Sequence, residues 1–363
     1  MKTEDLSKIP IFFILGRPRS GTTLLTTLFN AHPNVRIAPE FPFMLFLYQR
    51  FKKVRNWDEA TIRSFVDHAF SNTRFNYRTL NSLKIDKDTI TRELLHYKDN
   101  GSIQLFLKSI NYFAYSLFPK EETQWIGDKN PIYSLSAHRF RKIFPDAKFI
   151  CIIRDYRDNF ISMRTLAEKG LEVEAPVLSL QVSRWRYFVR LIFDCKRRYP
   201  DKYFILRYED LVTDQEKTFQ SLCSFIGITY NPSVFDFFKK KDETLKTYSN
   251  PVWEKFHGNL MNPITSGRMN IWKTELTNLQ VRMADQIAGK YADRLGYERK
   301  NKGFSTRLFF KSAPMLFYNH ILLRVMIFGT YLPHKVSQWW FLKMMILLKI
   351  YMRFFGKKPV QKT

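Results

Sequence analysis

Two glycines near the start of the chain have the spacing of a phosphate-binding loop. They bound the segment Gly16-Arg17-Pro18-Arg19-Ser20-Gly21-Thr22-Thr23, which follows a short apolar run and precedes a helical pattern. In a strand, loop and helix of this order, backbone N–H groups and the helix N-terminus can hold a cluster of anionic oxygens. Thr22 stands where an ATP or GTP site has lysine, and Arg19 lies inside the loop. The loop therefore predicts a different anionic ligand; the alternative is a tight turn with a chance arginine.

An arginine and a serine follow a second apolar run, at 147–153. Arg154 stands at the expected strand end, and Ser162 lies about two helical turns further along. A guanidinium and a hydroxyl on one helix face could hold a phosphate through charge-assisted hydrogen bonds. The same two residues would also suit a solvated helix face or a salt-bridged cap.

Strands and helices must position these side chains. The expected strands are 11–15, 147–153 and 203–206, and the expected amphipathic helices of the middle region are 58–71, 87–98 and 101–118. Strands that alternate with helices predict an α/β fold with a P-loop-like central parallel sheet flanked by helices. Because no flexible linker divides the chain, we expect one catalytic domain, 1–303, followed by a C-terminal helical tail, 304–363.

Both phosphate-binding candidates resemble those of the sulfotransferase family. The Pro-Arg-Ser-Gly-Thr-Thr loop is similar to the arginine-containing loop of tyrosylprotein and related sulfotransferases, and residues 144–163 resemble the family's 3'-phosphate-binding strand and helix. The resemblance spans about residues 10 to 295. It implies PAPS (3'-phosphoadenosine 5'-phosphosulfate) as sulfuryl donor, PAP as the desulfated product, and no metal.

The resemblance also implies roles for individual residues. The loop residues Arg17, Pro18, Arg19, Ser20, Gly21, Thr22 and Thr23 would bind the 5'-phosphosulfate. Arg154 and Ser162 would hold the 3'-phosphate, and Tyr208 would lie near the adenosine. Ser266 and Arg268 would belong to a loop that closes over the 3'-phosphate.

Transfer of a sulfuryl group to a hydroxyl needs a base for the proton and cations for the departing phosphate oxygens. Glu40 matches the catalytic glutamate of the arginine-loop enzymes, with Arg19 and Lys129 as the stabilising cations. The alternatives are that Glu40 is an ordinary helix N-terminal residue and that Lys129 is a surface lysine in a turn. His32 and His138 are weaker candidates for the base.

The C-terminal tail is strongly basic and aromatic. The formal net charge of the chain is +26, and from residue 301 onward there are 11 basic residues and no Asp or Glu. On a helix, Lys335, Lys343, Lys349 and Arg353 would share one face, opposite Trp340, Met344, Leu347, Leu348 and Tyr351. This amphipathic pattern predicts a helix at an anionic membrane surface; a helix packed on the catalytic domain or in a dimer is the alternative.

A membrane-bound enzyme would most naturally modify a sterol or other lipid hydroxyl. The resemblance alone equally allows sulfation of a protein tyrosine or a glycan. Two other functions compete: a nucleoside-phosphate kinase, disfavoured by Thr22, and a membrane or nucleic-acid adaptor without catalysis, favoured by the tail. Nucleic acid is not the expected partner, and the sequence does not determine the oligomeric state.

The three cysteines are widely separated and suggest neither a disulfide framework nor a zinc site. The first residues place acidic side chains before a short apolar stretch, unlike a signal peptide or a membrane span. We therefore expect a cytoplasmic protein, with attachment to the inner membrane surface through the tail.

Overall fold

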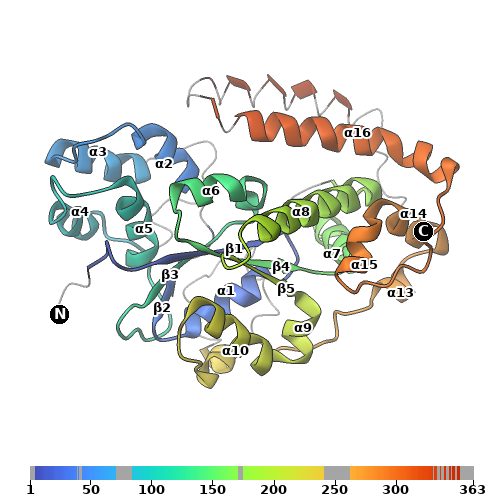
Figure 1. Ribbon diagram of the computed structural model, residues 1–363, viewed down its shortest axis with the longest axis horizontal. Coiled ribbons are helices and arrows are strands. Elements are labelled where there is room, and N and C mark those ends of the chain that lie inside the picture. The colour runs from blue at the N-terminus through green and yellow to red at the C-terminus, as the bar shows by residue number, and fades with distance from the viewer. Residues whose placement is uncertain are drawn as a thin grey trace.

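A computed structural model gives the fold of the chain. It describes residues 5–38, 40, 43–70, 84–170 (without the Ile132 side chain), 175–240, 262–329, 331–332, 336, 339–340, 343–344, 346–347 and 350–351. In Figure 1 a twisted sheet crosses the middle of the molecule, with helices above and below it.

The sheet has five parallel strands in the order β2-β3-β1-β4-β5. The strands are β1 (Ile11–Gly16), β2 (Val35–Ile37), β3 (Trp125–Lys129), β4 (Lys148–Ile153) and β5 (Tyr203–Arg207). Parallel strands need crossover connections, and the helices between them cover both faces. The predicted α/β class and parallel sheet are confirmed.

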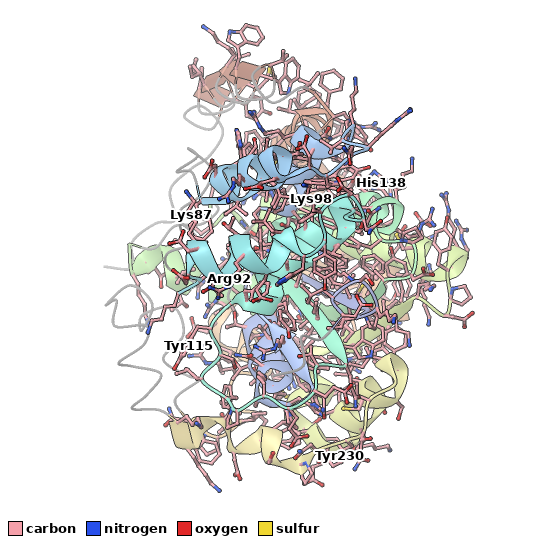
Figure 2. All side chains as sticks on the ribbon, turned by 90° about the vertical axis from the view of Figure 1, so that its left-hand side faces the viewer. Lys87, Arg92, Lys98, Tyr115, His138 and Tyr230 are labelled. Carbon is pink, nitrogen blue, oxygen red and sulfur yellow. The ribbon has the colours of Figure 1, made fainter. Side chains whose placement is uncertain are left out.

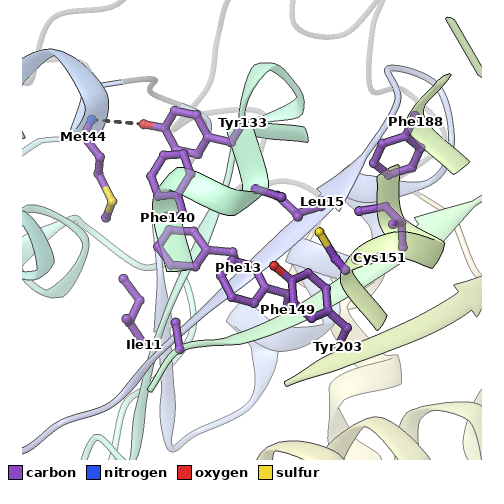
Figure 3. Packing of buried hydrophobic residues seen from close by; sticks show 14 of the residues in the cluster. Ile11, Phe13, Leu15, Met44, Tyr133, Phe140, Phe149, Cys151, Phe188 and Tyr203 are labelled. Carbon is purple, nitrogen blue, oxygen red and sulfur yellow. Dashed lines mark hydrogen bonds between the residues drawn. The ribbon is translucent and has the colours of Figure 1, made fainter. Parts of the chain in front are cut away.

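Strand β1 shows why both faces are covered. Phe13 and Leu15 point into one apolar core, and Phe12 and Ile14 point into a second core on the opposite face. Figure 3 shows the first core, where Phe13 packs between Phe140 and Phe149. An all-apolar strand of this kind is stable only when both sides are buried.

Helices α1 (Thr22–Ala31), α9 (Tyr208–Thr213) and α10 (Gln215–Ile226) cover the second core. The first core is covered mainly by α6 (Ala137–Ile143), α7 (Tyr156–Glu168) and α8 (Leu178–Arg198). Helix α14 (Asn278–Ala288) packs against α8. The short helices of these layers are η2 (Pro131–Ser136), η3 (Pro232–Lys240), α13 (Trp272–Glu275) and α15 (Lys290–Arg294).

A helical layer extends the first core beyond the β2 edge of the sheet. It contains α2 (Met44–Phe51), α3 (Glu59–Phe70), α4 (Lys87–Leu95) and α5 (Ile103–Phe113). Figure 2 looks onto this layer, where Lys87, Arg92 and Lys98 lie on the exposed surface. The predicted helices of the middle region are thus confirmed with slightly shorter bounds.

The C-terminal part begins with α16 (Thr306–Gly329), which lies along α8 (Figure 1). The described residues between 336 and 351 are helical. Trp340 and Tyr351 pack on α16, which itself belongs to the tail. Leu347, predicted on the face opposite Lys343, is 58% exposed, and Lys343 is exposed as well, so the predicted separation of basic and apolar faces is incomplete. Of the tail residues singled out above, Lys335, Leu348, Lys349 and Arg353 lie outside the described residues.

No helix in the described part of the chain is long and apolar enough to cross a bilayer.

Candidate active site

The predicted phosphate-binding loop, 16–23, lies between β1 and α1. Arg19 and Gly21 have positive φ angles of 67° and 91°, which turn the chain sharply into the helix. The Ser134 hydroxyl donates to the Gly16 carbonyl at 3.1 Å, and the Gly16 N–H lies 3.0 Å from the same hydroxyl oxygen. Because α1 begins at Thr22, the loop is followed directly by a helix N-terminus, which favours an anion.

Helices α7 and α8 hold the loop from one side. Asn159 donates from one amide nitrogen to the Pro18 carbonyl at 2.8 Å and to the Ser20 hydroxyl at 3.2 Å. Arg17 donates to the Gln181 side chain at 2.6 Å. Arg17 and Ser20 are buried, and both form hydrogen bonds within the protein. Thr22, the first residue of α1, is also buried, and Thr23 is half-buried.

Four of the predicted donor-binding residues meet beside the loop. The Arg154 guanidinium donates to the backbone carbonyls of Arg19 at 3.3 Å and Arg268 at 2.6 Å. The Arg19 side chain in turn donates to the Ser162 hydroxyl at 3.2 Å. Residues from three distant parts of the chain thus form one cationic cluster, which we call the arginine cluster (Arg19, Arg154 and Arg268).

The positive charges of the arginine cluster repel one another. Burial, together with the charges of Arg268 and Arg154, lowers the pKa of Arg19 to about 10. No described carboxylate forms an ion pair with Arg154 or Arg268, and Arg154 Nε is buried without a described hydrogen-bond partner. A bound phosphate would relieve the repulsion and supply acceptors for these donors.

Tyr208 closes the cluster from the end of β5. Its ring lies 4.8 Å from the Arg154 guanidinium carbon, and burial raises the pKa of its hydroxyl. The ring also packs directly on Gly21, since a β-carbon built there would lie 2.5 Å from Tyr208 Cδ2. Gly21 is therefore required both by its backbone conformation and by this contact.

The predicted closing loop reaches the cluster through its backbone. Asp158 on α7 accepts from the Asn270 N–H at 2.7 Å and the Trp272 N–H at 2.9 Å, which fixes the segment beside α7. The Arg268 carbonyl accepts from Arg154, whereas Ser266 is exposed in the turn and contacts the cluster through no described side-chain bond.

Lys129 and Glu40 meet at the end of β3. Lys129 Nζ lies 2.8 Å from Glu40 Oε2; the Lys129 side chain is 3% exposed and that of Glu40 is 46% exposed. Glu40 follows β2, which pairs with β3 in the sheet. Four residues after Glu40, the Met44 N–H donates to the Tyr133 hydroxyl (Figure 3). A buried ammonium and a solvent-accessible carboxylate are thus adjacent.

Asp128 is a buried carboxyl group directly before Lys129. It accepts from the Asn111 and Asn130 amides at 3.0 and 2.7 Å. Burial raises its pKa to about 6, although these two hydrogen bonds act in the opposite direction. The hydrogen bonds fix the end of β3, from which Lys129 projects.

Both histidine candidates are engaged elsewhere. The buried His32 ring bonds the Thr229 carbonyl at 2.8 Å and accepts from the Asn34 N–H at 3.2 Å. His138 Nε2 lies 2.7 Å from the Tyr331 hydroxyl. Neither ring faces Lys129 through a described contact, so Glu40 is the better-placed candidate for the base.

Sequence reasoning missed the residues that position the loop, namely Ser134, Asn159 and Gln181. Asn159 had a usable signal, because it lies one helical turn before Ser162 and therefore shares its face of α7. Ser134 and Gln181 carry no such signal, since only the packing of η2 and α8 brings them to the loop. Within the described residues, no three His, Cys, Asp or Glu side chains could together hold a metal ion.

Comparisons with known proteins extend these observations. A sequence model described as "Sulfotransferase family" matches residues 10–232. Protein-tyrosine sulfotransferase 1 of Danio rerio is 27% identical over 231 residues, 62% of this chain and 55% of the relative. The protein-tyrosine sulfotransferase of Drosophila melanogaster is 23% identical over 235 residues, 62% of this chain and 40% of the relative. The chain thus spans about half the length of these curated relatives.

Solved structures show the same fold. The sulfotransferase domain of the Synechococcus PCC 7002 olefin synthase matches with a TM-score of 0.50 and 20% identity, covering 82% of this chain and 98% of that domain. The sulfotransferase domain from the curacin biosynthetic pathway matches with the same TM-score and identity, covering 80% of this chain and 98% of that domain.

Proposed function

The chain belongs to the sulfotransferase family, and from this premise we propose that it transfers a sulfuryl group from PAPS to an acceptor hydroxyl. One observation carries the proposal: the arginine cluster beside a phosphate-binding loop, in which burial and neighbouring charges lower the pKa of Arg19. A donor with two phosphate-bearing ends would suit this arrangement, because the loop and the arginine cluster, which share Arg19, together offer donors to two neighbouring anionic groups.

In the proposed reaction, the acceptor oxygen attacks sulfur while the bond from sulfur to the bridging phosphate oxygen breaks. The acceptor proton passes to the Glu40 carboxylate, which solvent and an acceptor can reach. Arg19 and Lys129 neutralise the charge that develops on the departing phosphate. The Lys129–Glu40 contact supports these roles, because it puts the base and a cation within one site.

For the acceptor, the comparisons favour a protein tyrosine over a sterol or other lipid, because curated relatives of this chain are protein-tyrosine sulfotransferases. We therefore propose a phenolic hydroxyl as the first acceptor to test. Glycan sulfation and a non-catalytic adaptor have no comparable support. The division of the chain at 303/304, a cytoplasmic location, attachment to a membrane and metal-free transfer stay predictions.

Donor binding can be tested by thermal unfolding in the presence of PAP, ATP and AMP. We expect PAP alone to raise the melting temperature, since only PAP carries both the 3'- and the 5'-phosphate. Transfer from labelled PAPS is then measured with tyrosine peptides, a sterol and a glycan under identical conditions. Equal stabilisation by AMP and PAP would argue against the donor, and transfer to the sterol but not to the peptides would argue against the acceptor.

A further inference from the structure

The exposed side of α16 carries large apolar side chains. Phe310, Phe317 and Phe328 are 73%, 60% and 51% exposed. At 100° per residue, these three rings and Arg324 lie within an arc of about 40°. They therefore form one stripe along the helix, on the side roughly opposite Met315 and Leu322, which pack against α8 through Leu180.

A second stripe lies on the helical residues that follow. The exposed apolar residues are Val336, Trp339, Ile346, Leu347 and Ile350, between 46% and 58% exposed. Together with exposed Lys343 they lie within an arc of about 100° on a helix. This stripe differs from the packed side of the same segment, which contains Trp340 and Tyr351.

The two helical segments pair in antiparallel fashion. Trp340 Nε1 donates to the Val325 carbonyl at 3.2 Å, and the Tyr351 hydroxyl donates to the Pro314 carbonyl at 2.9 Å. We call α16 and the described helical residues of 336–351 the C-terminal hairpin. Figure 1 shows these residues alongside α16, on the outside of the molecule.

Helical geometry puts both stripes on one side of the C-terminal hairpin. On each helix, the stripe lies about 80° around the helix axis from the residues that contact the other helix. Viewed along the chain direction, this rotation has the same sense on both helices. In an antiparallel pair, equal rotations in the same sense face the same direction. The two stripes thus form one apolar surface, the outer face of the hairpin, which points away from α8.

The charges around the outer face are of one sign. Arg324 and Lys343 are exposed within the two stripes, and the sequence has no Asp or Glu after Glu298. A second copy of the chain on this face would bring two basic surfaces together, which is electrostatically unfavourable. An anionic lipid surface would instead accept both the apolar rings and the cations.

We propose that the outer face of the C-terminal hairpin docks on an anionic lipid bilayer, with both helices lying in the interface. Trp339 and the phenylalanines would enter the boundary between headgroups and acyl chains, where aromatic rings are favoured. Arg324 and Lys343, which lie within the two stripes, would extend their charged ends to the lipid phosphates. No described side-chain contact joins the two stripes to the loop or the arginine cluster, so docking and catalysis can be tested independently.

The test is co-sedimentation of the full chain with vesicles of phosphatidylcholine alone or with about 30% phosphatidylserine. We expect binding to the anionic vesicles that weakens as salt rises. Phe317→Ser combined with Ile346→Ser, one change on each helix, should lower the partition coefficient at least about tenfold. Arg324→Glu combined with Lys343→Glu should lower it by about 25-fold or more, at about fivefold for each charge.

Matched controls come from other surfaces. Leu279→Ser removes an equally exposed leucine from α14, and Lys217→Glu with Lys290→Glu reverses two exposed charges on α10 and α15. These controls should bind vesicles like the unaltered chain. The proposal is overturned if the unaltered chain does not bind anionic vesicles, if hairpin and control variants bind equally, or if the hairpin changes alter only the oligomeric state in gel filtration.

Discussion

Lys129 and Glu40 are 89 residues apart in the chain, and their side chains meet at 2.8 Å. The buried lysine lies at the end of β3 and the exposed glutamate follows β2, so the pairing of these two strands creates the contact. A proton acceptor is thereby placed beside a fixed positive charge.

Glu40→Gln should abolish most transfer while leaving donor binding intact. Glutamine keeps the shape of the side chain but cannot take up the acceptor proton, and loss of a general base typically costs about 10²–10⁴-fold in rate. The measurements are turnover with labelled PAPS and PAP affinity by calorimetry. Near-normal turnover would remove Glu40 from the mechanism.

Arg154→Ala should weaken PAP binding by about 10–100-fold, which corresponds to about 1.5–3 kcal/mol for a charge-assisted hydrogen bond. Ser162→Ala should act in the same direction, because its hydroxyl lies beside Arg19. Arg164→Ala is the control, because Arg164 lies on α7 with Ser162 but forms an ion pair with Glu275 and lies outside the arginine cluster. If all three variants bind PAP equally, the arginine cluster is not the phosphate site.

Gly21→Ala should destabilise the protein more than Gly170→Ala. Both glycines have positive φ angles, 91° and 74°, so alanine should cost about 1–2 kcal/mol of unfolding free energy at either position. At Gly21 the new methyl group collides with Tyr208, whereas at Gly170 no neighbouring atom of the described residues lies within 4 Å of the added carbon. Urea unfolding should reveal about 1–3 kcal/mol of additional loss for Gly21→Ala, accompanied by weaker PAP binding. Equal losses would contradict the packing of Tyr208 on the loop.

Asp128 should make stability depend on pH. Burial raises its pKa from 3.8 to about 6, so the folded state prefers the protonated carboxyl group. Its contribution to the free energy of unfolding is therefore greatest below about pH 4 and is lost as pH rises through about 6. Relative to Asp128→Asn, the unaltered chain should lose up to about 3 kcal/mol across this range.

Urea unfolding at several pH values between 4 and 7 measures this difference. Asp146→Asn is the control, because the Asp146 side chain is fully exposed. The loss should follow the titration of one group. Parallel pH profiles for the unaltered chain and Asp128→Asn would show that the Asp128 carboxyl does not resist ionisation in the fold.

Much of the fold could be predicted from the sequence because β1 is apolar, β4 is apolar after Lys148, and each strand is followed by an arginine-containing segment that leads into a helix. The three-residue strand β2 was not predicted, since its apolar pattern is too short to be distinguished from a loop. Packing of the tail on the catalytic domain was expected only as an alternative, and α16 was not identified as the helix that packs on α8. Helix α16 has apolar residues on almost every side, so its periodicity does not reveal which side is buried.

In the candidate site, sequence similarity identified the residues but not how they contact one another. Arg154 was expected to face a phosphate, yet in the structure it also bonds the backbone of Arg19 and Arg268. Glu209 accepts from the Asp155 N–H and the Tyr297 hydroxyl, contacts that span 54 and 88 residues. Interactions between such distant residues follow from the sheet order and leave no local pattern in the sequence.

The position of β1 at the centre of the sheet has a consequence for synthesis on the ribosome. Its neighbours on both sides, β3 and β4, are more than a hundred residues further along the chain. At about 5–20 residues per second, the first strand emerges on the order of ten seconds before β4 can pair with it. Until β3 emerges, the Ile11–Leu15 segment has two open edges and two apolar faces, which exposes it to pairing with other chains.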